Sequence, residues 1–108
     1  MTKVILKGTA ASLGIVKGKV KVILNPSECN KVEKGDIMVV EMTDPLYMTG
    51  IMKAGGLITD IGGLLSHAAI VAREMGIPCL VNTKKGTKVL KDNQIVIIDA
   101  EKGEVYGK

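Results

Sequence analysis

The residues best placed to do chemistry in this sequence lie between Gly62 and Pro78, a stretch that reads GGLLSHAAIVAREMGIP. It contains His67, the single histidine of the 108-residue chain. An unperturbed imidazole has a pKa of about 6.5, so a large fraction is neutral and nucleophilic near neutral pH. Such a ring can accept a phosphoryl group as a phosphoramidate, which divides one difficult transfer into two easier steps.

A short helix is predicted to position this histidine. Ser66 is a good N-cap, because its hydroxyl can accept a hydrogen bond from an early helix N–H. Gly76 suits the left-handed residue after a helix end, and Pro78 blocks continuation. We therefore expect His67 in the first turn, beside unpaired amides and the positive end of the helix dipole, where an anion is favoured.

The two glycines before the helix strengthen this prediction only moderately. Gly62 and Gly63 allow the backbone to approach a ligand closely or to adopt positive φ, but glycines are also ordinary turn residues. On local features alone, the preferred interpretation of His67 is a partly exposed polar residue that has no chemistry. The remainder of the helix should bury one face, made of Ala68, Val71, Ala72 and Met75. Ile70 lies off that face and packs on a neighbouring loop or forms a small exposed patch for a partner.

The rest of the chain reads as an α/β domain with a mixed sheet. Alternation over 16–24 predicts a half-buried strand with Val20, Val22 and Leu24 on one side and Ile23 with the lysines on the other. Asp44-Pro45 predicts a helix start, with the acid as N-cap and proline at the first helical position. Residues 9–14, 27–35 and 84–93 are expected to be turns and polar connections. The other strands are expected at 4–6, 36–42, 57–59, 79–81, 94–98 and 103–106.

Composition indicates one domain spanning residues 1–108 with an aliphatic core, since the chain is 46% hydrophobic but contains neither Phe nor Trp. Cys29 and Cys79 belong to no metal-binding pattern, and no zinc or other metal site is predicted. We expect Cys79 to be buried in a strand and Cys29, in a polar stretch, to be exposed or half exposed. Both thiols are expected to be reduced.

Several partner classes are disfavoured by the sequence. No apolar run is long enough to span a membrane, and the N-terminus lacks the apolar core of a secretory signal, so a cytoplasmic protein is expected. The formal net charge is +4, but the lysines are scattered. Without aromatic stacking platforms or a recognised motif, nucleic acid is not the expected partner, and a basic nucleic-acid-binding domain ranks third among the hypotheses.

The stretch GGLLSHAAIVAREMGIPCLVNT resembles the phosphohistidine signature of the phosphoenolpyruvate-utilising (PEP-utilising) enzymes. That family includes pyruvate phosphate dikinase, PEP synthase and enzyme I of the sugar phosphotransferase system and, more distantly, rifampicin phosphotransferase. The resemblance extends over nearly the whole chain, through GTAASLGIVKGKVKVI, GDIMVVEMTDP, AGGLITDIGG and IDAEKGEVY. It implies a swivelling β/β/α phosphohistidine domain, with a mixed sheet and two or three helices, that carries phosphate between two distant active sites.

The resemblance also implies roles for individual residues. His67 corresponds to the phosphorylated histidine, and Gly62, Gly63 and Ser66 correspond to the loop and cap. Thr59 corresponds to a threonine just before that loop, although a threonine there also commonly bonds its own backbone. Arg73 matches the family's helix arginine, which would meet phosphate or an acidic partner if it is not simply a solvated helix residue.

One residue departs from the family pattern. Leu65 stands where many relatives have the threonine that a regulator phosphorylates in plant and bacterial dikinases. Leucine has no hydroxyl, so regulation at this position is excluded and a hydrogen bond near the histidine is lost. Ser66 is the alternative hydroxyl, but capping is its expected role.

The sequence also lacks the parts needed for a complete phosphotransferase cycle. It contains no Gly-rich nucleotide loop followed by Lys-Ser or Lys-Thr and no carboxylate set for magnesium. We therefore expect no cofactor on this chain alone, with PEP or ATP and magnesium bound by a separate PEP-binding or nucleotide-binding protein. The leading hypothesis is a stand-alone transferase component that carries phosphate on His67 in trans. The alternative is a non-catalytic regulatory or interaction module that kept the fold.

Overall fold

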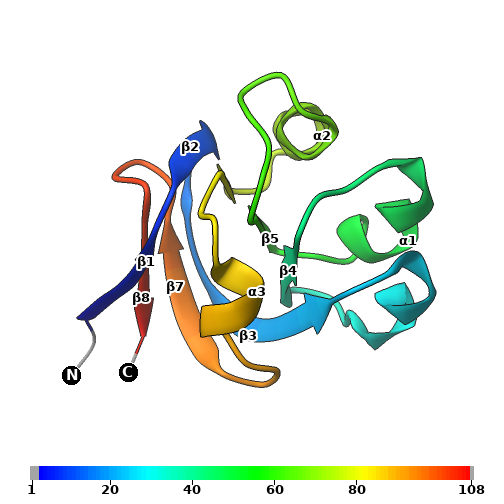
Figure 1. Cartoon of the computed structure of the whole chain (residues 1–108), viewed down its shortest axis with the longest axis horizontal. Helices are drawn as coiled ribbons and strands as arrows, with labels where there is room; N and C mark the ends of the chain where they lie inside the picture. The colour runs from blue at the N-terminus through cyan, green and yellow to red at the C-terminus, as the bar shows by residue number, and fades with distance from the viewer. Residues whose placement is uncertain (1–2, 108) are drawn as a thin grey trace.

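The computed structural model describes residues 3–107, which form eight strands, three α-helices and two 3-10 helices (Figure 1). The strands are β1 (Lys3–Lys7), β2 (Thr9–Ser12), β3 (Ile15–Ile23), β4 (Ile37–Val40), β5 (Gly56–Thr59), β6 (Cys79–Val81), β7 (Ile95–Asp99) and β8 (Glu104–Gly107). The helices are η1 (Pro26–Lys31), η2 (Pro45–Tyr47), α1 (Met48–Ile51), α2 (His67–Met75) and α3 (Gly86–Val89).

Strand β3 joins an antiparallel half of the sheet to a largely parallel half. The strand order is β1-β8-β7-β3-β4-β5-β6-β2. β3 pairs antiparallel with β7 through its first residues and parallel with β4 through its last ones. β4, β5 and β6 continue in parallel, and β2 closes this half antiparallel to β6. The predicted mixed sheet is confirmed.

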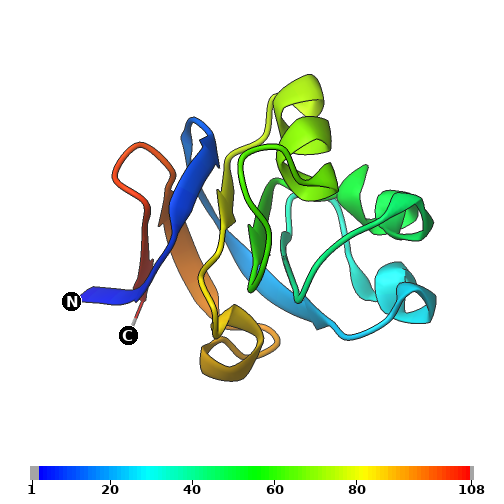
Figure 2. The same ribbon diagram turned by 45° about the horizontal axis from the view of Figure 1, so that its top comes forward.

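The sheet halves and helices form three layers, as the β/β/α expectation requires (Figure 2). One core cluster fills the space between the two halves of the sheet, because alternate residues of β4 and β5 face the inward residues of β3, β7 and β8. It consists mainly of Leu6, Val20, Ile37, Val39, Ile58, Leu80, Val96, Ile98 and Val105. The other faces of β4, β5 and β6 carry a second cluster, which also holds the alanines of α2.

Two predicted connections contain regular structure that the sequence pattern did not reveal. Residues 9–12 form β2, whose small side chains lie against β6 and α2. Residues 86–89 form the single turn α3, which Asp60 holds by accepting hydrogen bonds from the N–H and hydroxyl of Thr87. Both elements depend on contacts with distant strands, so a local pattern does not predict them.

The end of β3 also departs from the predicted alternation. Ile23 is fully buried, whereas Leu24 is 68% exposed and lies beyond the strand. The reason is that the end of β3 pairs with β4 instead of β7, and η1 covers the side of β3 that carries Ile23. A strand shared by two layers buries residues on both faces, which a simple period of two does not describe.

Both cysteines are free and buried. The prediction of an exposed or half-exposed Cys29 is wrong: its thiol packs in the core beneath Gly50, where an added Cβ would lie 3.2 Å from Sγ. Cys79 is buried in β6 as expected. Burial raises the pKa of the Cys79 thiol to about 12, so this thiol stays protonated and unreactive near neutral pH.

A partly buried ion pair between β3 and the start of β4 makes acid stability predictable. Lys21 Nζ lies 2.8 Å from Asp36 Oδ2. Burial alone would raise the pKa of Asp36, but hydrogen bonds from Lys21 and from the N–H of Glu33 outweigh it, so the pKa is lower than usual. A carboxyl with a lowered folded-state pKa stabilises the fold above its unfolded pKa of about 3.9 and loses that contribution as the pH falls below it.

We expect the free energy of unfolding, measured with urea, to fall between pH 5 and pH 2.5, roughly the interval in which an unfolded carboxyl titrates. Asp36→Asn should be less stable at pH 7 and should show a shallower acid-dependent loss. An equally steep loss in the variant would contradict this assignment.

Among residues 3–107, none of the helices has the length and apolarity that a membrane span needs.

Candidate functional site

His67 is the first residue of α2, as its sequence context predicts. Ser66 caps the helix: its hydroxyl oxygen accepts from the N–H of Ala69 at 3.4 Å and donates to the carbonyl of Gly63 at 2.8 Å. The helix ends at Gly76, whose φ of +71° is left-handed. The predicted start and end of this helix are confirmed.

The histidine lies where the parallel strands β4 and β5 end. The ladder between them continues into their loops, with the N–H of Asp60 donating to Val40 at 3.1 Å and the N–H of Ile61 donating to Glu41 at 3.0 Å. This edge therefore brings residues 41–44 beside residues 60–66, the loop that leads into α2. The carboxyl ends of parallel strands are the usual location of ligand sites in α/β sheets.

Thr43 is the functional-site residue that sequence reasoning missed. Its Oγ1 lies 2.8 Å from His67 Nδ1, and the threonine itself is only 6% exposed. When Nδ1 carries the ring proton, the N–H donates to Thr43 and the Nε2 lone pair is left free. Within residues 3–107, Nε2 makes no hydrogen bond. The sequence shows only that Thr43 follows a buried strand, and the pairing of that strand with β5 is what brings it to His67.

The glycine loop adopts a conformation that depends on one of its two glycines. Gly62 has a φ of +119°, and a Cβ added there would lie 3.1 Å from Ser66 Oγ. Gly63 has open space around the position of a Cβ, while its carbonyl accepts both the Ser66 hydroxyl and the Ser66 N–H. Gly62 therefore sets the loop's shape, and Gly63 anchors the cap through its backbone.

Thr59 supports the loop from inside the protein. It is fully buried, and its hydroxyl donates to the carbonyl of Ile61 at 2.8 Å. Its own carbonyl accepts from both the N–H and the hydroxyl of Thr83, on the segment that follows β6. Thr59 thus bonds nearby backbone, the structural alternative noted from the sequence, and its hydroxyl is already used.

Arg73 also holds the loop, although the residue is exposed on the surface of α2. Its Nε donates to the carbonyl of Ala11 at 2.8 Å, and its Nη2 donates to the carbonyl of Leu64. The guanidinium therefore connects α2, the glycine loop and β2. In this structure Arg73 is a positioning residue for the loop that carries the histidine.

The surface next to His67 is apolar. Leu65 is 85% exposed, and Leu64 and Ile70 are each about half exposed. Of the two alternatives left open for Ile70, this exposure fits the small exposed patch. On the buried side of α2, Ala69 is fully buried and Met75 is 37% exposed, so the predicted inclusion of Met75 in the buried face is wrong. The helix lies close to β6 and β2, where alanine fits and a longer side chain does not.

Comparison with known proteins identifies the domain. Residues 32–103, which include both site loops and α2, match the family model described as the PEP-utilising enzyme, mobile domain. The chain belongs to this family.

The relatives of this mobile domain are much longer than the chain. It is 53% identical over 104 residues to a probable phosphoenolpyruvate synthase of Archaeoglobus fulgidus, covering 96% of this chain and 14% of that protein. It is 51% identical over 104 residues to phosphoenolpyruvate synthase of Pyrococcus furiosus, covering 96% of this chain and 13% of that protein. The chain thus spans about one seventh of the length of these relatives.

Solved structures share the mobile domain's fold at low sequence identity. A solution structure of enzyme I aligns with a TM-score of 0.74 at 15% identity and covers 93% of this chain and 91% of that one. Aconitase X of Thermococcus kodakaraensis aligns with a TM-score of 0.66 at 17% identity and covers 95% of this chain and 97% of that one. These likenesses confirm the expected fold.

Proposed function

We propose that this mobile domain is a phosphohistidine carrier that accepts a phosphoryl group on His67 and passes it on. The observation that carries the proposal is the contact between His67 Nδ1 and Thr43 Oγ1 at 2.8 Å, at the start of a helix. A proton held on Nδ1 by this contact leaves Nε2 as the nucleophile. The family and the PEP synthase relatives support the same role.

The transfer balances without any group beyond donor and acceptor. The Nε2 lone pair attacks the phosphorus, the phosphorus–oxygen bond to the donor breaks, and the departing oxygen keeps the bonding electrons. The proton stays on Nδ1, where it is hydrogen-bonded to Thr43 Oγ1. In the second half, an acceptor oxygen attacks the same phosphorus, and the nitrogen–phosphorus electrons return to Nε2.

The start of α2 supplies the electrostatics that phosphoryl transfer requires. The N–H groups of His67 and Ala68 open the helix and have no intrahelical carbonyl partner. Together with the helix dipole, they would stabilise the phosphoryl oxygens. Arg73 would act indirectly by fixing the loop through Leu64 and Ala11.

The donor would be PEP or ATP with magnesium, bound by a partner protein that works in trans with this chain. The names of two relatives, a probable phosphoenolpyruvate synthase and a phosphoenolpyruvate synthase, support this choice of donor. The chain would then act as the mobile component of a phosphotransferase.

A labelling experiment with a full-length relative tests the proposal. The donor is P. furiosus PEP synthase with alanine at the position aligned with His67, so that label cannot remain on the donor's own segment. We expect phosphate from labelled PEP, or from ATP labelled at either the β or the γ position, to appear on this chain. The product should be labile in acid and stable in base, as phosphohistidine is.

A non-catalytic interaction module is the second candidate, and the 85% exposure of Leu65 beside the histidine favours it. If this chain stays unlabelled with both substrates while the unaltered relative becomes labelled, and the two proteins still associate, the interaction module is the better description. Label at a residue other than His67 would contradict the carrier mechanism.

A further inference from the structure

The antiparallel half of the sheet leaves one broad face uncovered. We use the term outer face for the side of β1, β8, β7 and β3 that points away from the core. One row of paired residues crosses all four strands, because Val4 pairs with Tyr106, Tyr106 with Ile97, and Ile97 with Lys17. The inward neighbours Val96, Ile98 and Val105 are all buried in the core.

The outer face is more apolar than is usual for a sheet face in contact with water. An antiparallel sheet with one wet face normally alternates apolar inward residues with polar outward ones. In β7, however, Ile95 and Ile97 point outward, so the strand reads as if both of its faces were buried. Ile95 is 51% exposed and Val4 is 38% exposed. Such a pattern indicates that another layer packs here.

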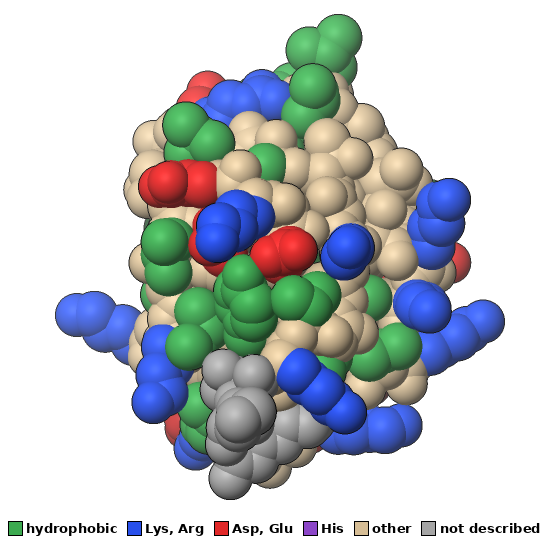
Figure 3. All heavy atoms as spheres, turned by 90° about the vertical axis from the view of Figure 1, so that its left-hand side faces the viewer, with side chains coloured by type: hydrophobic (Ala, Val, Ile, Leu, Met, Phe, Trp, Pro, Cys, Tyr) green, Lys and Arg blue, Asp and Glu red, His purple; other side chains and the backbone are tan. Residues whose placement is uncertain are grey.

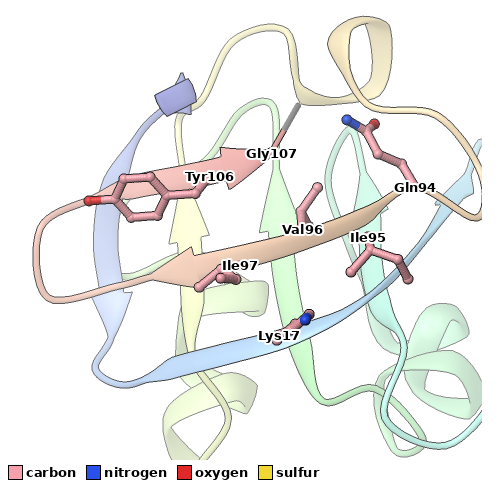
Figure 4. A pocket seen from close by; sticks show the side chains of 7 residues that line it. All are labelled: Lys17, Gln94, Ile95, Val96, Ile97, Tyr106 and Gly107. Carbon is pink, nitrogen blue, oxygen red and sulfur yellow. The ribbon is translucent and has the colours of Figure 1, made fainter. Parts of the chain in front are cut away.

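The centre of the outer face is hollowed. A depression of about 370 Å³ is lined by Lys17, Gln94, Ile95, Ile97 and Tyr106. Figure 4 shows Lys17, the two isoleucines and Tyr106 on the adjacent strands β3, β7 and β8, with Gln94 just before β7. This is room for a large apolar side chain of an incoming segment.

Lysines border this apolar centre. Lys17 and Lys19 lie on the exposed edge of β3, and neither forms an ion pair within residues 3–107. The nearby Glu104 carboxylate already accepts from the Tyr106 hydroxyl at 2.6 Å. Figure 3, which looks onto the side with β1 and β8, shows a group of hydrophobic side chains near the middle with acidic and basic groups directly beside them, and further basic groups toward the rim.

We propose that the outer face is a docking surface for an amphipathic helix of a partner protein, with an apolar stripe flanked by Asp or Glu. Acidic flanks would meet Lys17 and Lys19, whereas a second copy of this chain would oppose lysine with lysine. The face is about 14 Å wide, three strand spacings, which matches about ten helical residues.

This surface is separate from the phosphate-carrying end. α2 packs on the parallel half of the sheet, in the opposite outer layer (Figure 2). A partner held at the outer face therefore leaves His67 free, and the inference does not depend on the proposed carrier role.

Two synthetic peptides test the proposal directly. Both are capped 18-residue amphipathic helices with leucines at helical spacing; one has glutamate and the other lysine on both flanks of the stripe. We expect the glutamate peptide to bind at least about tenfold more tightly at low salt, measured by calorimetry, with the difference shrinking as salt screens the charges. Amide NMR signals of β1, β3, β7 and β8 should shift, and those of α2 should not.

Surface variants locate the interaction without disturbing the core. Ile95→Glu should lower the affinity for the glutamate peptide about tenfold or more. Lys17→Glu should make the lysine peptide bind more tightly than the glutamate peptide. Two control variants should change neither the affinity for the glutamate peptide nor the preference between the peptides. They are His67→Ala and Leu46→Glu, which replaces a 71% exposed leucine elsewhere. The proposal would be overturned by equal affinity for the two peptides, by no binding of either, or by NMR shifts confined to α2. It would also be overturned if sedimentation showed a dimer that Ile95→Glu dissociates.

Discussion

His67→Ala is expected to remove all acid-labile phosphate from this chain in the labelling experiment. The reason is that the sequence contains no second histidine, so no other imidazole can take over. The substitution should leave the fold intact, because His67 is at the surface end of α2 and Ser66 retains the cap. Circular dichroism and the urea midpoint check that the loss is chemical rather than structural.

Substitution of Thr43 should reduce the labelling rate without abolishing it. Thr43→Val removes the partner of Nδ1, so the ring loses its fixed tautomer and orientation, and the labelling rate should fall about 10- to 100-fold. Thr43→Ser keeps the hydroxyl and should recover most of the rate. If the valine variant were labelled as fast as the wild type, the role assigned to the Thr43 contact would be wrong.

Gly62→Ala is expected to destabilise the protein by about 1–3 kcal/mol, the usual cost of forcing a side chain into a backbone conformation that disfavours it. At a φ of +119°, the new Cβ would also lie 3.1 Å from Ser66 Oγ and 3.2 Å from Ser66 Cβ. The cap must then move, and with it the amides at the start of α2. We therefore expect slower phosphoryl labelling as well as a lower urea midpoint.

Gly63→Ala is the matched control, one residue along the same loop. Nothing lies within 4 Å of its added Cβ, and its φ is not positive. Its free energy of unfolding should stay within about 0.5 kcal/mol of the wild type, as for most surface substitutions. If both alanines had the same effect, loop shape would not depend on the Gly62 conformation.

The sequence alone determined the features that depend on neighbouring residues. Ser66 caps α2 and Gly76 ends it because both act through local backbone hydrogen bonds and local dihedral preferences. The buried parallel strands were recognisable because β-branched and aliphatic residues fill them continuously. The ordered matches to the family signature then implied the β/β/α layers and the histidine's place in them.

Tertiary structure decided which distant residues meet. Thr43 reaches His67 only because β4 and β5 are parallel neighbours whose loops leave the same edge. Arg73 binds the carbonyl of Ala11 because β2 pairs with β6, beside α2. Cys29 is buried because η1 and α1 pack together. None of these pairings has a local sequence signal, since each depends on the order of strands and the contacts of layers rather than on the identity of adjacent residues.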